Sequence, residues 1–177
     1  EDYENQVVPA SLAGGVGATL TNGGETQHEG LEVGVRLDTG TLTGSTHNVF
    51  VRGALTWLPV ARFEGNRFSN VPGSAAVNVS GNRLPDAPET LPPSAVGYPQ
   101  PRGLLAQVEV VHVGEQFADD LNSVTASADG QRGLIPAHTI CNVAVSWDLR
   151  RVTLFVTAKN LLDELYLVDR SRGMIPG

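Results

Sequence analysis

The residue types that most often carry catalysis or bind metal are few and widely separated in this chain. The histidines, His28, His47, His112 and His138, show none of the short spacings through which histidine binds zinc. No local motif is typical of a Ser-His-Asp triad. Cys141 has no second cysteine to pair with, and its place in an alternating apolar stretch is typical of a small hydrophobic residue. The sequence therefore predicts neither an enzyme nor a resident metal or cofactor.

Charge and glycine content argue against two further kinds of site. The net charge of -7 disfavours nucleic acid as a partner, because phosphate binding needs a clustered excess of lysine and arginine. The run Gly14-Gly15-Val16-Gly17 could suggest a phosphate loop, but neither a helix nor the Lys-Ser/Thr pair of a P-loop follows it. We assign it to a long loop of small residues. No stretch approaches the ~20 consecutive apolar residues of a membrane helix.

Alternation of apolar and polar residues is the clearest structural signal. It runs from His138 to Leu149 and, after the pair Arg150-Arg151, restarts at Val152 and continues to Ala158. A two-residue period is typical of a strand with unlike faces, and two such strands joined by so short a link form a hairpin. The same pattern predicts strands over 28–38, over 48–58 and from 104 to 110, and a shorter strand over 3–8. Together with the abundant glycine, proline, valine and threonine, this indicates an all-β protein in which helices are disfavoured.

The lengths of the connections predict how the strands are arranged. Long connections at 9–27, 61–89 and 118–136 alternate with short ones at 39–47, 99–103 and 150–151. All long loops then lie at one end of the strands, as in an up-and-down membrane barrel and unlike a Greek-key sandwich. Trp57 at a loop end and Trp147 at a turn end fit two interfacial girdles, although Trp147 would equally suit a sandwich core. The predicted fold is an antiparallel up-and-down meander of about seven strands, a partial wall of a large transmembrane β-barrel.

Separate segments, in the right order, resemble TonB-dependent outer-membrane receptors. They are NGGETQHEGLE at 22–32, GNRLPDAPE at 81–89, GEQFADD at 114–120, KNLLDELY at 159–166 and RSRGMIPG at 170–177. Leu162 departs from the pattern, because an aromatic residue is commoner there. Pro92-Pro93 also depart from it, since prolines stand where a strand should donate hydrogen bonds. That strand is expected to be bulged, shortened or shifted, and to run from about Ser94 to Tyr98.

The resemblance implies that residues 1–177 are a fragment of the receptor's barrel, with the plug, the earlier strands and the final strand absent. Such receptors lie in the bacterial outer membrane, in contact with its lipid. They bind a scarce nutrient, typically a ferric siderophore, and import it with energy that TonB delivers through the plug domain. The loops look closest to the ferric dicitrate-like branch. Two alternatives stay open: a receptor for a non-iron nutrient, and a soluble all-β module that binds a ligand or carbohydrate. For 159–168 the alternative is an amphipathic helix.

The same resemblance implies where ligand would bind. Ferric-siderophore complexes are often anionic, so the expected ligand-binding residues are loop arginines, each able to offer a forked donor. The candidates are Arg67, Arg83, Arg132, Arg170 and Arg172. The alternative for each is a solvated loop charge or an ion pair with Asp or Glu. In the wall itself, we expect Val145 to face lipid at the membrane midplane and Ala144 to face the lumen. The first strand and the 152–166 strand should lie far apart.

Overall fold

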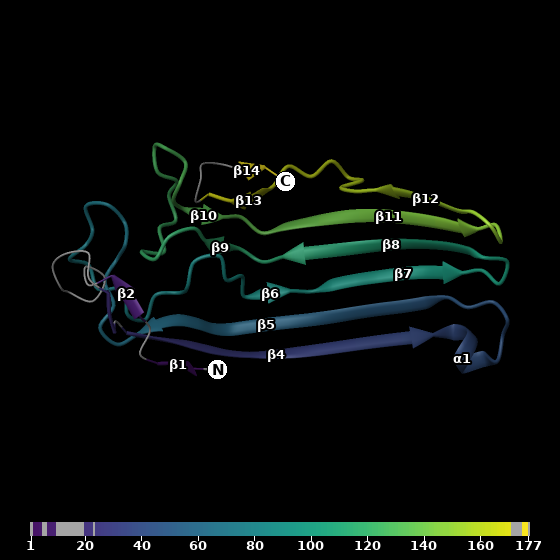
Figure 1. Cartoon of the computed structure of the whole chain (residues 1–177), viewed down its shortest axis with the longest axis horizontal. Helices are drawn as coiled ribbons and strands as arrows, with labels where there is room; N and C mark the ends of the chain where they lie inside the picture. Colours follow the sequence, from purple (N-terminus) through teal and green to yellow (C-terminus); the bar gives the residue numbers. More distant parts are fainter. Residues whose placement is uncertain (1, 5–6, 10–19, 23, 171–174, 177) are drawn as a thin grey trace.

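A computed structural model describes residues 2–4, 7–9, 20–22, 24–170 and 175–176. One antiparallel sheet dominates it, with strands in the spatial order β1-β4-β5-β7-β8-β11-β12 and with β6 paired to β5 (Figure 1). These strands are β1 (Asp2–Tyr3), β4 (Glu25–Asp38), β5 (Phe50–Glu64), β6 (Thr90–Leu91), β7 (Pro93–Pro99), β8 (Leu104–Val113), β11 (His138–Asp148) and β12 (Thr153–Ala158). The order confirms the predicted meander. β1 and β12 stand at opposite edges, so the sheet does not close on itself.

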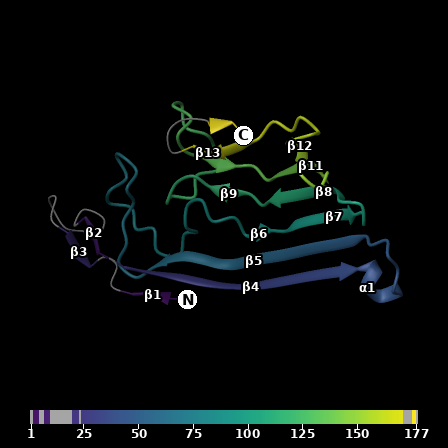
Figure 2. The same cartoon turned by 45° about the vertical axis from the view of Figure 1, so that its right-hand side comes forward.

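Long loops and short turns lie at opposite ends of this sheet, as the sequence predicts. Three small hairpins accompany the loop end, on the left in Figures 1 and 2. They are β2 (Val7–Pro9) with β3 (Leu20–Asn22), β9 (Gln116–Phe117) with β10 (Leu134–Ile135), and β13 (Leu167–Asp169) with β14 (Ile175–Pro176). The predicted strand over 3–8 is divided between β1 and β2, and residues 5–6 lie outside the described part. Among the described residues no helix has both the length and the apolar character needed to cross a membrane.

One short helix, α1 (Thr39–Thr43), occupies the connection between β4 and β5, where no helix was predicted. It begins directly after Asp38 and ends at Gly44, whose φ of 68° is the left-handed conformation that commonly terminates helices. Five residues are too few to show a helical period in a sequence. The turn therefore escaped the pattern that marks the strands on either side of it.

Pro92 and Pro93 interrupt the wall without shifting it. Leu91 in β6 lies opposite Thr56 of β5, and Ser94 in β7 lies opposite Gly53, so the register continues across the gap. The ladder is broken only where proline has no N–H to donate. The strand that was expected to be bulged, shortened or shifted, and to run from about Ser94 to Tyr98, is thus divided into β6 and β7, and β7 extends from Pro93 to Pro99.

β5 continues six residues beyond Leu58, into the segment that was predicted to be irregular. Trp57 lies opposite Leu31, but Val60 lies opposite Glu29, so β5 takes one more step than β4 between these two pairs. The extra residue is a β-bulge at Leu58–Pro59, a place where proline is tolerated in a sheet. The irregular part of the loop begins only after Glu64.

The segment after Ala158 is neither a continued strand nor a helix. Asn160 and Asp163 both have positive φ, 49° and 53°, which no helix permits. The Asn160 side chain donates to the carbonyl of Glu164 at 2.9 Å and accepts from its N–H at 3.0 Å. Such bonds from an asparagine to nearby backbone favour turns over strands. The strand predicted to extend to 166 therefore ends at Ala158.

Candidate functional site

The two faces of the sheet differ sharply in chemistry. On one, which we call the apolar face, large hydrophobic side chains are directly opposite one another from β4 to β12 and are exposed. They include Leu31, Val33, Val35, Leu37, Val51, Leu55, Trp57, Val96, Val108, Val110, Val145, Trp147, Leu154 and Val156. Val35 is 58% exposed and Val156 71%. Soluble monomers rarely expose a contiguous apolar surface larger than a few hundred Å².

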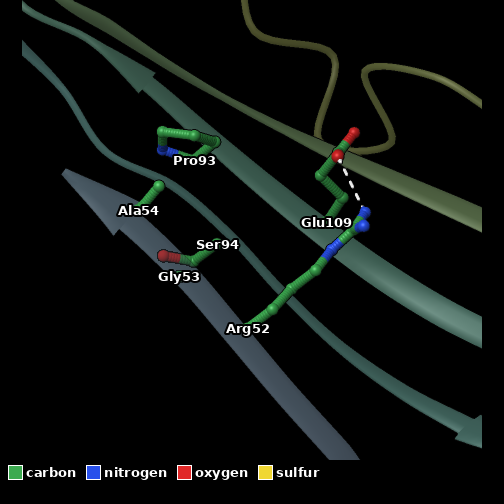
Figure 3. A pocket seen from close by; sticks show the side chains of 6 residues that line it. All are labelled: Arg52, Gly53, Ala54, Pro93, Ser94 and Glu109. Atoms are coloured by element: carbon green, nitrogen blue, oxygen red, sulfur yellow. Dashed lines mark ion pairs between the residues drawn. The ribbon is translucent and has the colours of Figure 1, made fainter. Parts of the chain in front are cut away.

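The opposite face carries a row of polar side chains that lie in register across the strands. Arg36 is opposite Arg52, and Glu109 is opposite Asn142, with the buried Ala95 between the two pairs. Arg52 reaches over Ala95 to Glu109, its Nη2 lying 3.7 Å from a carboxylate oxygen (Figure 3). Asn142 donates to the other oxygen at 3.3 Å. We call Arg36, Arg52, Glu109 and Asn142 the polar row.

Like charges directly opposite one another destabilise a sheet, so the pair Arg36 and Arg52 needs compensation. Arg36 donates two hydrogen bonds to Asp38, at 2.8 and 3.0 Å, and its guanidinium lies 4.5 Å from the centre of the Phe50 ring. Arg52 has Glu109. A pocket of about 230 Å³ opens beside Arg52, where Pro93 interrupts the ladder (Figure 3).

The apolar face has a defined upper and lower limit. On β4 the residues that share the apolar face change from the hydrophobic Leu31 to the charged Glu29. Leu31 lies opposite Trp57, whose indole N–H donates to Glu89 at 3.1 Å. The apolar positions of this parity on and just after β11 run from Cys141 to Leu149, eight residues apart, or about 26 Å along the strand. A strand tilt of about 40° reduces this to about 20 Å of height. The apolar band of outer-membrane barrels is about 25 Å tall. The two tryptophans thus lie at opposite margins of the band, although Trp57 is inside β5 instead of at its end.

At the loop end, residues 65–89 and 118–136 are joined into one unit, which we call the loop platform. The carboxylate of Asp120, 4% exposed, accepts hydrogen bonds from the Ser69 hydroxyl and the Asn70 N–H, both at 2.7 Å. Asn82 in turn donates to the Asp120 carbonyl at 2.8 Å. Buried carboxylates need such partners, because an unpaired buried charge is costly. Asp120 thereby fixes the first loop onto the second.

A second contact between these loops involves Arg83. Its N–H donates to the Asn122 side chain at 2.7 Å, and the Asn122 amide donates back to the Arg83 carbonyl at 2.8 Å. The guanidinium donates to the carbonyls of Leu58, Pro59 and Ala87, at 2.7, 3.3 and 2.8 Å. Arg83 therefore ties the loop platform to the bulge of β5.

The candidate arginines differ in how far they are engaged by the protein. Arg170 is 7% exposed and donates to the carbonyls of Leu134 and Gly130 at 3.2 and 3.4 Å. Arg67 lies over the Phe63 ring, 5.3 Å from its centre; burial lowers the pKa of its guanidinium, which the charge of Asp120 partly offsets. The guanidinium of Arg132 makes no hydrogen bond to a described residue. Arg172 lies outside the described residues.

Arg132 lines a pocket of about 440 Å³ between the two loops of the platform. Asp119, Asp120 and Asp129 also line it, together with Asn70. Hydrogen bonds from the Ser127 hydroxyl and the Gln131 N–H hold the pKa of Asp129 below its usual value. The pocket thus presents one forked cation among fixed carboxylates, a lining able to bind a ligand that carries both acceptors and donors.

The residues that build this site were only partly recognisable in the sequence. Asp119 and Asp120 appear there as the end of a family-like segment, with nothing to indicate burial. Short polar side chains such as Ser69, Asn82 and Asn122 indicate turns, but not which distant turn they contact. Within the part of the chain that the structure describes, no cluster of histidine, cysteine, aspartate and glutamate could hold a metal ion.

Comparison with known proteins agrees with this architecture. A family model described as "TonB dependent receptor-like, beta-barrel" matches residues 1–161. The chain is similar to the ferric citrate transporter FecA in its unliganded form, with 27% identity and a TM-score of 0.69 over 91% of this chain and 24% of that one. It is also similar to the ferric-catecholate import receptor Fiu from E. coli K12, with 18% identity and a TM-score of 0.64 over 99% of this chain and 22% of that one. A third similar structure is the siderophore receptor PiuA from Acinetobacter baumannii, with 18% identity and a TM-score of 0.65 over 90% of this chain and 21% of that one. The chain therefore spans about a quarter of the length of these structures or less.

Proposed function

The chain belongs to the TonB-dependent receptor β-barrel family, and from this premise we propose that it forms part of the wall and outer loops of a bacterial outer-membrane receptor that imports a ferric siderophore. The apolar face is the observation that carries the membrane location. Its valines and leucines are in register from β4 to β12 and end at the levels of Trp57 and Trp147. In water this exposed apolar surface would cause the protein to aggregate, whereas in a membrane it would be in contact with the lipid acyl chains. The polar row then faces the lumen.

The ligand enters this proposal through the relatives. FecA is a ferric citrate transporter, and its identity with this chain is higher than that of Fiu or PiuA. We accordingly assign the chain to the ferric dicitrate-like branch, with the Arg132 guanidinium as the group of the loops that contacts an anionic iron complex. Transport energy would come from TonB through a plug domain that fills the lumen.

Uptake by cells that carry the complete receptor tests this assignment. Arg132→Ala should lower uptake of radiolabelled ferric dicitrate several-fold while the amount of receptor in the outer membrane stays unchanged, because loop residues contribute little to the strand ladder. Arg132→Lys keeps the charge but not the fork, and should restore only part of the uptake. Arg83→Ala is the matched comparison: it leaves carbonyls at the bulge unpaired, so it should lower the amount of receptor.

Two results would contradict the proposal in different ways. Unchanged uptake in Arg132→Ala would remove this arginine from the ligand site and leave the receptor assignment standing. No uptake of any iron complex by the wild-type receptor, across a panel of ferric siderophores, would favour the alternative of a receptor for a non-iron nutrient.

A further inference from the structure

Two neighbouring turns at the end opposite the loop platform bring arginines together. One turn joins β7 to β8 and contains Arg102; the other joins β11 to β12 and contains Arg150 and Arg151. The N–H of Asp148 donates to the carbonyl of Gly103 at 2.9 Å, which holds the two turns side by side. Gly103 has a φ of 90°, and a Cβ there would lie 2.7 Å from the Asp148 carbonyl, so only glycine permits this approach.

These arginines are exposed and unpaired within the described residues. Elsewhere in the sheet the arginines have carboxylate partners, as Arg36 has in Asp38 and Arg62 has in Glu64 at 2.6 Å. The nearest carboxylate along the chain, Asp148, shares its parity with Ser146 and Ala144 and so belongs to the polar face. The residues of the two turns, 99–103 and 148–152, therefore hold three arginines against one carboxylate, an excess of positive charge.

Arg150 is in a left-handed backbone conformation, which glycine and asparagine adopt at a lower cost in free energy than arginine. Arg150 has a φ of 65°, and the N–H of Arg151 donates to the Leu149 carbonyl at 2.7 Å across it. A left-handed residue in a turn this tight favours glycine or asparagine. The long arginine side chain projects from the tip of the turn.

The apolar side chains that end the wall at this point are Trp147, opposite both Leu104 and Leu154, and then Leu149. Trp147 is 48% exposed and Leu149 42%. Tryptophan at the margin of an apolar band marks the level of lipid headgroups, and arginine just beyond it lies where headgroup phosphates are found.

We propose that Arg102, Arg150 and Arg151 form a binding site for the phosphate of an anionic phospholipid in the leaflet around the turn end of the wall. The inference rests on the proposed membrane location. The guanidinium forks donate to the phosphate oxygens, and the acyl chains lie along Trp147 and the valines of the apolar face. Anionic lipid is favoured over zwitterionic lipid because the three arginines outnumber Asp148, the one carboxylate of the two turns.

Native mass spectrometry of the complete receptor, released from micelles titrated with phosphatidylglycerol or phosphatidylcholine, measures this preference. The wild-type receptor should retain phosphatidylglycerol more tightly. The variant R102Q/R150Q/R151Q should lose the preference, with an effect of up to about fivefold for each arginine removed. R102K/R150K/R151K should keep part of it, and raising the ionic strength should weaken it in the wild type. Glycerol phosphate, which lacks acyl chains, should compete poorly.

Arg62→Gln is the matched control, because Arg62 is a cation at the loop end that is already paired with Glu64. It should leave the preference unchanged. Equal retention of both lipids by the wild type, a preference that survives in the triple glutamine variant, or a loss of equal size in Arg62→Gln would each overturn the phosphate site while the receptor assignment stands. Failure of the wild-type receptor to insert into bilayers at all, seen as a lack of heat-modifiable migration, would instead overturn the membrane location and with it this inference.

Discussion

Replacing Val143 by arginine tests the central claim that the apolar face contacts lipid. Val143 lies opposite Val108 on one side and Ala158 on the other. It is four residues, about 13 Å along the strand, from Trp147. Val143 and Val145, the midplane position predicted from the sequence, both lie inside the band, because the apolar positions of this parity run from Cys141 to Leu149.

The expected cost follows from this depth. An arginine facing lipid at the midplane of a β-barrel costs ~2–4 kcal/mol, and near the interface ~0–1 kcal/mol. Val143→Arg and Val145→Arg should therefore each destabilise the folded receptor by ~2–4 kcal/mol. Ala144→Arg places the same side chain on the polar face, opposite Gln107 and Thr157, where water and the polar row surround it. Its cost should be below ~1 kcal/mol.

Reversible unfolding of the complete receptor by denaturant in lipid bilayers would measure these differences. Val143→Ala serves as the control for lost packing, since it removes the same methyl groups without adding charge. Equal costs for Val143→Arg and Ala144→Arg would refute the assignment of the two faces. Unequal costs at Val143 and Val145 would keep the faces and mark the residue with the larger cost as the one closer to the midplane.

Three further predictions concern the loops and the break in the ladder. Asp120→Ala leaves the Ser69 hydroxyl buried without its acceptor and should destabilise the loop platform by about 1.5–3 kcal/mol, seen as faster proteolysis of residues 65–89 in an otherwise folded receptor. Pro93→Thr restores an N–H toward β5 and should stabilise the wall by about 1 kcal/mol in the same unfolding assay, whereas unchanged or lower stability would mean that the gap has no unpaired acceptor. Burial and, secondarily, the charge of Asp169 raise the pKa of Asp86, so the platform should lose stability as pH rises through that pKa and regain it below the usual aspartate value. Hydrogen-exchange protection factors around Asp86, corrected for the intrinsic exchange rate at pH 7 and at pH 3, would show this, and Asp86→Asn should make the difference smaller.

The faces of the wall were predictable from the sequence because the strand period is a local property. Each alternating stretch specifies which side chains share a face, and the lengths of the connections specify which ends meet. The limits of β5 were less accessible, because its bulge at Leu58–Pro59 reverses the parity of the residues that follow. Alternation counted from Trp57 would place Phe63 on the same face as Trp57. In the structure Arg62, opposite Gln27, is on that face instead, together with Glu25.

The loop platform was not predictable, since its contacts join residues about fifty positions apart. Asp120 is bound to Ser69 and Asn70, and in the sequence each of these residues is typical of a solvated loop. The same distance explains why five arginines looked alike: only the fold shows that carbonyl groups occupy Arg83 and Arg170 while the Arg132 guanidinium stays available.

The hydrogen bonds of the platform also bear on how a ligand would be bound. Asp119 accepts hydrogen bonds from the Leu121 N–H, the Ser123 hydroxyl and the Gly133 N–H, all between 3.0 and 3.1 Å, and it is 5% exposed. Its carboxylate therefore orders residues 119–133 before any ligand arrives. Because ordering a loop on binding costs free energy, a pocket whose walls are already fixed loses less affinity to that cost. The arrangement around Asp119 thus favours a pocket that is formed in advance. Arg132 is held at the edge of this pocket by a turn, in which the Arg132 N–H donates to the Ser127 hydroxyl.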